Sequence, residues 1–287
     1  MPRIAYVNGR YVPHGAAVVH IEDRGYQFAD GVYEVCEVAR GHIIDMTRHL
    51  DRLSRSLSEL SIAWPVDRGA LQILMREVVR RNRVRNGLVY LQVTRGVASR
   101  DHVFPHPSTR PALVITAKHT DPTAAAKRAE SGIKVITVPE NRWERVDIKS
   151  TGLLPNVLAR QKAKSEGAQE AWFVDPDGTV KEGAATNAWI VTKDGTLVTR
   201  PAETGILRGV TRTTVFDVAA KLGFTIEERN FSVDEAKAAR EAFITAATTI
   251  VMPVVAIDGS TVANGHPGSV ALSLREAFFD VAEKKLA

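Results

Sequence analysis

The 287-residue sequence contains one cysteine, no long apolar run and no leader-like start. Cys36 cannot form a disulfide within the chain, which predicts a reducing, cytoplasmic location and a core position for this residue. The longest uncharged stretch, residues 242–257, contains threonines and a proline and is too short to cross a bilayer. The first residues lack the apolar segment of a signal peptide. We therefore expect a soluble protein with no membrane partner.

Signs of a metal site or of a nucleic-acid surface are also missing. The eight histidines show no metal-ligand spacing with cysteine or carboxylates, so we expect no metal. Basic residues exceed acidic ones by 38 to 33, and a net charge of +5 does not by itself indicate nucleic acid. Five arginines between residues 76 and 85 favour a solvated helix end. The alternative is a basic binding module without catalytic activity.

Composition and length favour a globular protein with two domains. Hydrophobic residues make up 44% of the chain and charged residues 25%. Apolar periodicity lapses after residue 117, and we predict an α+β domain at residues 1–119, a linker at 120–124 and a second α+β domain at 125–287.

Within the first domain, Asn8-Gly9 between two apolar segments predicts a hairpin. Leucines at helical spacing predict a helix over residues 47–60, with Thr47 as its N-cap. The remaining elements expected here are a helix at 68–83 and strands at 88–95 and 111–117.

The second domain is predicted to mix strands and helices throughout. The apolar run 243–257 indicates buried strand structure. The other expected strands are 133–138, 170–174, 188–191 and 224–227. The expected helices are 155–166, 211–222, 233–239 and one from about residue 270.

Lys149 lies between a predicted strand and a predicted helix, near the middle of the chain. A lysine becomes a nucleophile when burial or a cationic neighbour favours its neutral amine, and it then forms an imine with an aldehyde. A solvated loop lysine is the alternative, and position alone does not decide between the two.

Two glycine-containing segments suit a flat ligand and an anion. Glu182 precedes four small residues, so backbone can approach a planar ligand closely there, and its carboxylate can pair with a pyridinium nitrogen. Residues 205–211 open a predicted helix whose free N–H groups, with the Thr211 hydroxyl, suit a phosphate. An exposed turn and a plainly capped helix are the alternatives.

Arg100 and His102 stand two apart in a loop that follows a predicted strand. The planar fork of arginine suits a bidentate grip on a carboxylate, and a nearby histidine adds a second donor. A polar loop without a ligand is the alternative.

Taken in order, these segments resemble the class IV (fold type IV) pyridoxal-phosphate aminotransferases, and within them the D-amino-acid transaminases. The resemblance covers nearly the whole chain. It rests on residues 22–28, 30–34, 49–53, 92–96, 147–150, 182–183 with Asn187, and 209–212.

The resemblance implies a two-domain fold with pyridoxal 5′-phosphate between the domains. Lys149 is similar to the lysine that forms the Schiff base and moves the substrate Cα proton. Glu182 is similar to the carboxylate that holds the pyridine nitrogen. Leu207 would pack against the cofactor ring.

The phosphate group would be held by Arg52 and by backbone at Val210 and Thr211. The familiar D-amino-acid enzymes carry a run of hydroxyl residues in a second phosphate loop. This chain has Thr245-Ala246-Ala247-Thr248 there, so Ala247 and Thr248 are expected to contribute backbone N–H groups, and a side-chain contact from Ala247 is missing.

Tyr33, Arg100 and His102 resemble the trap for the substrate α-carboxylate. In the family the arginine and histidine come from the neighbouring subunit, which implies a homodimer. The reaction implied is ping-pong transfer of an amino group between a D-amino acid, such as D-alanine, and a 2-oxo acid, such as 2-oxoglutarate. A branched-chain L-amino-acid aminotransferase and an aminodeoxychorismate lyase of the same fold are alternatives, and the carboxylate trap argues against the lyase.

Overall fold

The computed structural model describes residues 3–203 and 205–287. The chain divides into two units. The first comprises Met1–Pro122, Ile148–Gly152 and Glu283–Ala287, and the second comprises Thr123–Asp147 and Leu153–Ala282. The expected division into residues 1–119 and 125–287 therefore differs at two places, around Lys149 and at the last five residues. The expected linker at 120–124 also differs, because α4 (Pro122–Ser131) already begins within it.

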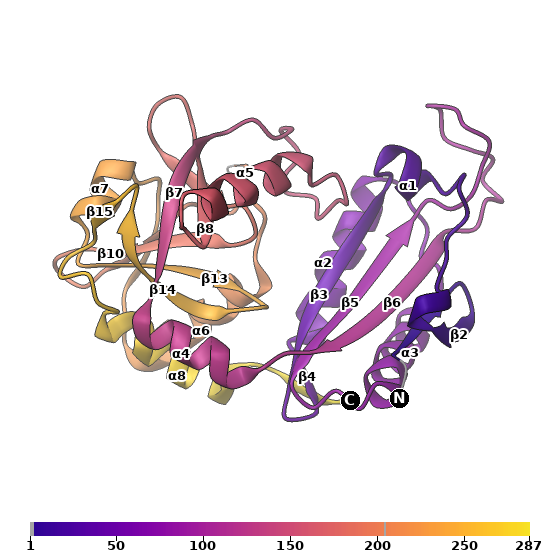
Figure 1. Cartoon of the computed structure of the whole chain (residues 1–287), viewed down its shortest axis with the longest axis horizontal. Coiled ribbons are helices and arrows are strands. Elements are labelled where there is room, and N and C mark those ends of the chain that lie inside the picture. The colour runs from indigo at the N-terminus through magenta and orange to yellow at the C-terminus, as the bar shows by residue number, and fades with distance from the viewer. Residues whose placement is uncertain (1–2, 204) are drawn as a thin grey trace. The chain divides into compact units, whose positions relative to one another are not determined.

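The first unit is built on a seven-stranded sheet in the order β16-β4-β3-β5-β6-β1-β2. The C-terminal strand β16 pairs antiparallel with β4 at the sheet edge, so both ends of the chain belong to this unit (Figure 1). The strands are β1 (Ile4–Val7), β2 (Arg10–Pro13), β3 (Gly31–Ala39), β4 (His42–Ile44), β5 (Gly87–Thr94), β6 (Ala112–His119) and β16 (Lys284–Leu286). The helices are a 3-10 turn (His14–Ala16), α1 (Arg24–Phe28), α2 (Met46–Glu59) and α3 (Arg68–Arg81).

Alternation along β3 explains how this sheet is covered. Residues at even positions, such as Val32, Cys36 and Val38, are buried, whereas the odd positions after Gly31 are half-exposed. The buried set packs with Leu50 and Leu53 of α2 into one core, as expected for a sheet with one face against helices. The prediction that Cys36 belongs to the core is confirmed.

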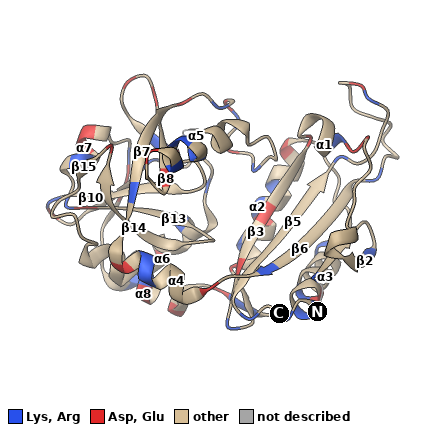
Figure 2. Cartoon of the chain, viewed as in Figure 1, with Lys and Arg blue, Asp and Glu red and all other residues tan. Residues whose placement is uncertain are grey.

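Two sequence-based expectations concerned helix ends, and the first of them was wrong. The N-cap of α2 is Asp45, so the prediction of Thr47 was wrong. The hydroxyl and amide of Thr47 instead donate to the carboxylate of Glu283, a partner 236 residues away. At the other helix, Arg80 and Arg81 bond Glu77 on the exposed end of α3, as expected for a solvated helix end. Charges of both signs are interspersed along the ribbon (Figure 2).

The second unit is built on a nine-stranded sheet, ordered β12-β11-β10-β13-β14-β7-β8-β9, with β15 paired to β14. The strands are β7 (Ile133–Pro139), β8 (Glu170–Val174), β9 (Val180–Gly183), β10 (Asn187–Val191), β11 (Leu197–Thr199), β12 (Ile226–Glu228), β13 (Glu241–Ala246), β14 (Ile250–Ile257) and β15 (Ser260–Thr261). Its further helices are α5 (Leu154–Ser165), α6 (Val210–Leu222), α7 (Val233–Ala238) and α8 (Ser269–Val281).

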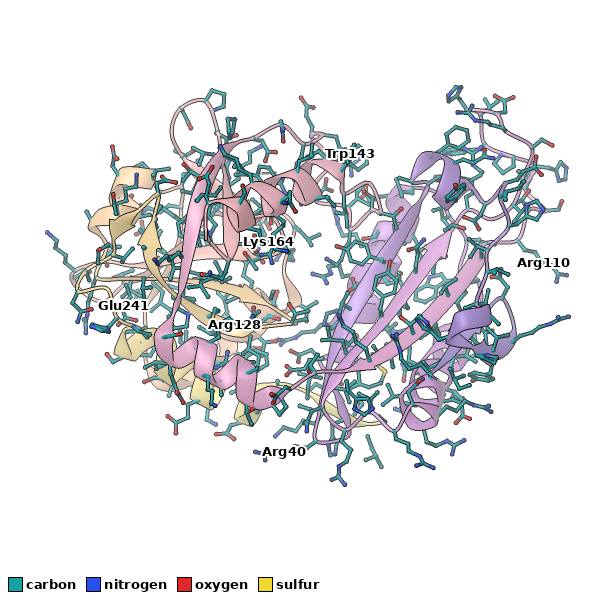
Figure 3. The ribbon with its side chains drawn as sticks, in the orientation of Figure 1. Arg40, Arg110, Arg128, Trp143, Lys164 and Glu241 are labelled. Atoms are coloured by element: carbon teal, nitrogen blue, oxygen red, sulfur yellow. The ribbon has the colours of Figure 1, made fainter. Side chains whose placement is uncertain are left out.

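Aromatic packing places α6 against this sheet. Trp189 of β10 stacks on Phe243 of β13 with ring centroids 5.4 Å apart, and it meets Phe216 of α6 at 5.5 Å. At the strand end, Glu241 accepts hydrogen bonds from the amides of Val270 and Ala271 and so caps α8 (Figure 3 labels Glu241). Among the described residues, no helix is both long and apolar enough to cross a membrane.

Candidate active site

Lys149 is held by the open edge of β3. β4 pairs only with the end of β3, at Val38 and Ala39. The same edge at the start of β3 can therefore form hydrogen bonds with the segment that contains Lys149. The amide of Tyr33 donates to Lys149 O at 3.0 Å, and the amide of Thr151 donates to Gly31 O at 3.0 Å. These bonds fix the backbone of Lys149 although no helix or strand contains it.

The amine of Lys149 lies beside a phenol. Its Nζ is 3.3 Å from the Tyr33 hydroxyl and 4.4 Å from the centre of that ring. Tyr33 in turn lies 5.7 Å from Tyr90 between ring centroids, and Tyr90 donates to Gln92 at 2.6 Å. Burial raises the pKa of Tyr90 to about 12, so this phenol keeps its proton. The structure therefore brings the predicted residues Lys149 and Tyr33 into direct contact.

The buried carboxylate of Glu34 fixes Arg52. Glu34 directly follows Tyr33 on β3. Glu34 accepts from Arg52 Nε at 2.7 Å and from Nη2 at 2.8 Å, and its second partner, His49 Nδ1, lies at 2.6 Å. Burial alone would raise the pKa of Glu34, but Arg52 and His49 lower it to about 2. Sequence reasoning assigned no role to Glu34 or His49, although both fall in the segments that carry the resemblance.

Glu182 lies on strand β9, so the alternative of an exposed turn was wrong at this residue. Its carboxylate is buried and receives three hydrogen bonds, from Arg142 Nη1 at 2.7 Å, Asn187 Nδ2 at 3.1 Å and the Leu207 amide at 3.2 Å. Burial raises the pKa of Glu182, and Arg142 opposes that rise. A buried carboxylate of this kind suits a protonated ring nitrogen.

Arg142 was not singled out from the sequence. It is itself clamped by Glu140, whose two carboxylate oxygens accept from Nε and Nη2 at 2.9 and 2.6 Å. Its guanidinium also lies 4.2 Å from the ring centre of Phe173. No local sequence pattern predicts the contact between Arg142 and Glu182, because Arg142 lies in an irregular segment and the two residues are 40 positions apart.

Asn187 connects the segments expected to hold the ring and the phosphate. Its Nδ2 donates both to Glu182 and to the carbonyl of Leu207, the latter at 2.9 Å. Its Oδ1 faces Gly209, where an added Cβ would come within 2.0 Å. Because β10 pairs with β13, Asn187 also stands opposite Thr245, just before the second expected phosphate loop.

The groups around this asparagine fit a phosphate. Gly209 is the N-cap of α6, so the amides of Val210 and Thr211 lie in the first turn, where helix N–H groups have no partner within the helix. The loop after Thr245 turns at residues 247–249. There the hydroxyl of Thr249 is buried without a hydrogen-bond partner in the described part of the chain. An anion acceptor would satisfy such donors.

Arg100 and His102 lie in the loop between β5 and β6 and are exposed. Both contact one side chain, Phe28 of α1. The guanidinium of Arg100 is 4.9 Å from the ring centre, and the His102 ring centroid is 5.4 Å from it. The two predicted carboxylate ligands therefore share one aromatic contact on the same loop.

The structure thus forms two clusters, each described within its own unit. One brings together Lys149, Tyr33 and Arg52, with Arg100 and His102 on a loop of the same unit. The other brings the Leu207 amide onto Glu182, with Val210 and Thr211 at the start of α6 and Ala247 and Thr248 in the turn after β13. Donors for phosphate, a carboxylate for a pyridinium and an amine for an aldehyde are all present, so the residues fit pyridoxal phosphate.

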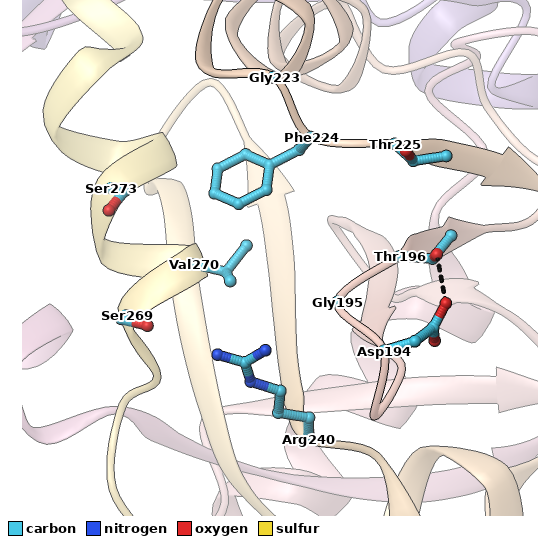
Figure 4. Close-up of a pocket in the computed structure, with 10 residues that line it drawn as sticks. All are labelled: Asp194, Gly195, Thr196, Gly223, Phe224, Thr225, Arg240, Ser269, Val270 and Ser273. Carbon is cyan, nitrogen blue, oxygen red and sulfur yellow. Dashed lines mark hydrogen bonds between the residues drawn. The ribbon is translucent and has the colours of Figure 1, made fainter.

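A pocket of about 410 Å³ elsewhere in the second unit contains none of the predicted site residues (Figure 4). Phe224, Val270 and Arg240 contribute to its lining. Within residues 3–203 and 205–287, no three histidine, cysteine or acidic residues form a group that can hold a metal ion.

Comparison with known proteins identifies the class. Residues 31–257 match the family described as amino-transferase class IV. The chain is 38% identical over 270 residues to a D-alanine aminotransferase of Bacillus licheniformis, covering 94% of each chain. It is 37% identical to a D-alanine aminotransferase of Staphylococcus haemolyticus, covering 98% of each. A branched-chain amino acid aminotransferase of T.th., solved with pyridoxamine 5′-phosphate, has a TM-score of 0.88 at 26% identity, covering 98% of this chain and 94% of that one.

The chain belongs to the class IV aminotransferases. It is accordingly a pyridoxal-phosphate-dependent enzyme whose substrates are amino acids and 2-oxo acids, and the sequence-based expectations of family, fold and cofactor are confirmed. The individual site residues are not tested by these comparisons and stay predictions.

Proposed function

We propose that this protein transfers amino groups between D-amino acids, such as D-alanine, and 2-oxo acids, such as 2-oxoglutarate. The observation that carries the proposal is the pair Arg100 and His102, which both contact Phe28 and would supply hydrogen-bond donors to a carboxylate. Relatives at 37–38% identity that are named D-alanine aminotransferases support it.

Lys149 is the catalytic group in this proposal. When bound, pyridoxal phosphate supplies an aldehyde and an electron-accepting ring. Lys149 Nζ would hold the cofactor through its aldehyde carbon, and once freed by the substrate amine it would remove the proton at the substrate Cα and deliver it to that same carbon. Support comes from its fixed backbone on β3 and from the contact of Nζ with the Tyr33 hydroxyl.

The second unit would hold the cofactor without reacting. Glu182 holds the proton on the ring nitrogen, which strengthens electron withdrawal, and Leu207 packs on the ring. The amides of Val210, Thr211, Ala247 and Thr248 bind the phosphate, and Arg52 of the first unit adds a positive charge.

Tyr33, Arg100 and His102 would bind the substrate α-carboxylate and so decide which hand of amino acid reacts. Because one lysine serves one face, the side on which the carboxylate is held selects the enantiomer. The same site then takes a 2-oxo acid in the second half of a ping-pong cycle.

The proposal includes a homodimer. In it, the loop that carries Arg100 and His102 serves the active site of the neighbouring subunit. Large apolar side chains are exposed near the loop, including Ile21 and Tyr26 at 76% and Val103 at 68%. Exposed apolar side chains in such number favour a subunit contact. A cytoplasmic location also stays a prediction, supported by the single reduced cysteine, Cys36.

The test is a half-reaction screen of D- and L-amino acids against the holoenzyme, followed by absorbance of the bound cofactor. We expect D-alanine to convert the cofactor at least about tenfold faster than L-valine or L-leucine, a barrier difference of about 1.4 kcal/mol. Conversion by the L-amino acids alone would instead support a branched-chain aminotransferase, the activity named for the structure solved with pyridoxamine 5′-phosphate. A protein that stays colourless with added cofactor would contradict the proposed function and favour the basic binding module.

A further inference from the structure

Asp30 joins two arginines that both contact the loop between β5 and β6. Its Oδ2 accepts from Arg24 Nε and from Arg95 Nε, each at 2.7 Å, and its Oδ1 accepts from Arg95 Nη2 at 2.9 Å. All three side chains are at most 12% exposed. A buried carboxylate that binds two guanidinium groups holds both in fixed positions.

Arg24 reaches from this carboxylate to the backbone of the loop. Its Nη1 donates to the carbonyl of Asp101 at 2.6 Å and to the carbonyl of Val103 at 3.3 Å. These two carbonyls bracket His102. One guanidinium therefore ties down both sides of a residue that the proposed function uses to bind substrate.

Phe28, four residues after Arg24 on α1, extends the support to Arg100. The Arg24 guanidinium lies 4.9 Å from the Phe28 ring centre, the same distance as the guanidinium of Arg100. The helix itself is anchored by Asp23, which accepts from the Gly25 amide at 2.8 Å and from the Thr94 hydroxyl at the end of β5 at 3.0 Å.

Arg95 contacts the same loop through Phe104. Its guanidinium lies 3.7 Å from the ring centre of Phe104. Its remaining hydrogen bonds go to the carbonyls of Leu60 at 2.8 Å and Ser61 at 3.1 Å, just after α2. Asp30 thus connects the loop to the end of α2 through one arginine and to α1 through the other.

Residues 98–111 of this loop contain no helix or strand, so helix or sheet hydrogen bonding does not set the conformation around Arg100 and His102. Ordering a backbone segment costs conformational entropy, and a binding site on a loop that must be ordered on binding loses affinity by that route. We propose that Arg24 and Asp30 are positioning residues that preset Arg100 and His102 for the substrate carboxylate. This inference rests on the proposed function of the loop.

The test is a double-mutant cycle on the holoenzyme with D-alanine as substrate. Arg24→Gln should raise KM about tenfold, with kcat within about twofold and the absorbance of the bound cofactor unchanged. In a background that lacks both ligands, Arg100→Ala with His102→Ala, the same change should add less than about twofold, because the groups that Arg24 positions are already gone. An equal effect in both backgrounds would show a general structural role and overturn the inference.

Phe104→Ala provides a variant with little risk to folding, because that side chain is 63% exposed. It should raise KM about threefold, and an unchanged KM would count against the inference if Arg24→Gln does not fold. Arg80→Gln, which removes an exposed arginine paired with Glu77 on α3, is the matched control and should leave KM unchanged. If Arg100→Ala itself leaves KM unchanged, the proposed function fails. If it raises KM and Arg24→Gln does not, only the inference fails.

Discussion

Arg142 donates a hydrogen bond from Nη1 to Oε1 of Glu182 at 2.7 Å, and both side chains are at most 6% exposed. Burial favours the protonated form of Glu182, and the guanidinium favours the carboxylate. The contact therefore helps keep Glu182 negatively charged, as a partner for the cofactor's protonated ring nitrogen requires.

The first prediction concerns this pair. Arg142→Gln removes the group that opposes burial, so the pKa of Glu182 should rise further. The acid limb of the kcat/KM profile should then move to higher pH. The measurement is a pH profile of transamination for the variant and for Arg145→Gln, an exposed control. An unmoved acid limb would show that Arg142 does not act through Glu182.

The second prediction concerns the nucleophile. Lys149→Ala should lower the half-reaction rate by about 10²–10⁴-fold, the usual contribution of a positioned acid–base group. The variant should also release cofactor on dialysis, and borohydride should no longer attach it to the protein. Lys164→Ala, on an exposed part of α5 (Figure 3), is the control and should behave as wild type. Covalent attachment that survives in Lys149→Ala would assign the reactive lysine elsewhere.

The third prediction is a pH dependence of stability at Glu34. Its pKa in the folded protein is about 2, below the ordinary 4.5, which corresponds to about 3 kcal/mol of stability at neutral pH. That contribution is fully present above the ordinary pKa of 4.5 and is lost as the pH falls through about 2. Glu34→Gln should therefore destabilise the protein by about 3 kcal/mol near neutral pH, and less as the pH falls.

Urea unfolding of wild type and variant at about pH 7 and about pH 3 measures this difference. Glu130→Gln, an exposed carboxylate on α4, is the control and should change stability by less than about 0.5 kcal/mol. A destabilisation by Glu34→Gln that does not depend on pH would mean that packing, rather than the charge, carries the effect.

The fourth prediction concerns the first turn of α6. Gly209→Ala would place a Cβ 2.0 Å from Asn187 Oδ1, so either the helix start or Asn187 must shift. Because both border the proposed phosphate site, the cofactor should bind about tenfold more weakly, as typical overpacking costs of about 1–3 kcal/mol imply. Equilibrium dialysis against pyridoxal phosphate measures this. Gly15→Ala, where the added atom meets open space, should bind cofactor normally.

Most elements could be predicted from sequence because their periodicity is local. The strand at 170–174 was predicted with the observed bounds, and helices α2, α5 and α6 within a residue or two. The uncharged run 243–257 shows where such reasoning stops. It folds into two strands with a turn at residues 247–249, and a continuous apolar stretch has no feature that marks such a break.

The sequence by itself determined the class of enzyme, because the order and spacing of its motifs survive without coordinates, and it marked Lys149, Glu182, Arg100 and His102 as candidates. Only the tertiary structure decided what surrounds them. It placed Lys149 on the edge of β3, Glu34 between Arg52 and His49, and Arg142 on Glu182. Such partners are far apart along the chain. Burial and charge pairing select them, and neither leaves a periodic pattern in the local sequence.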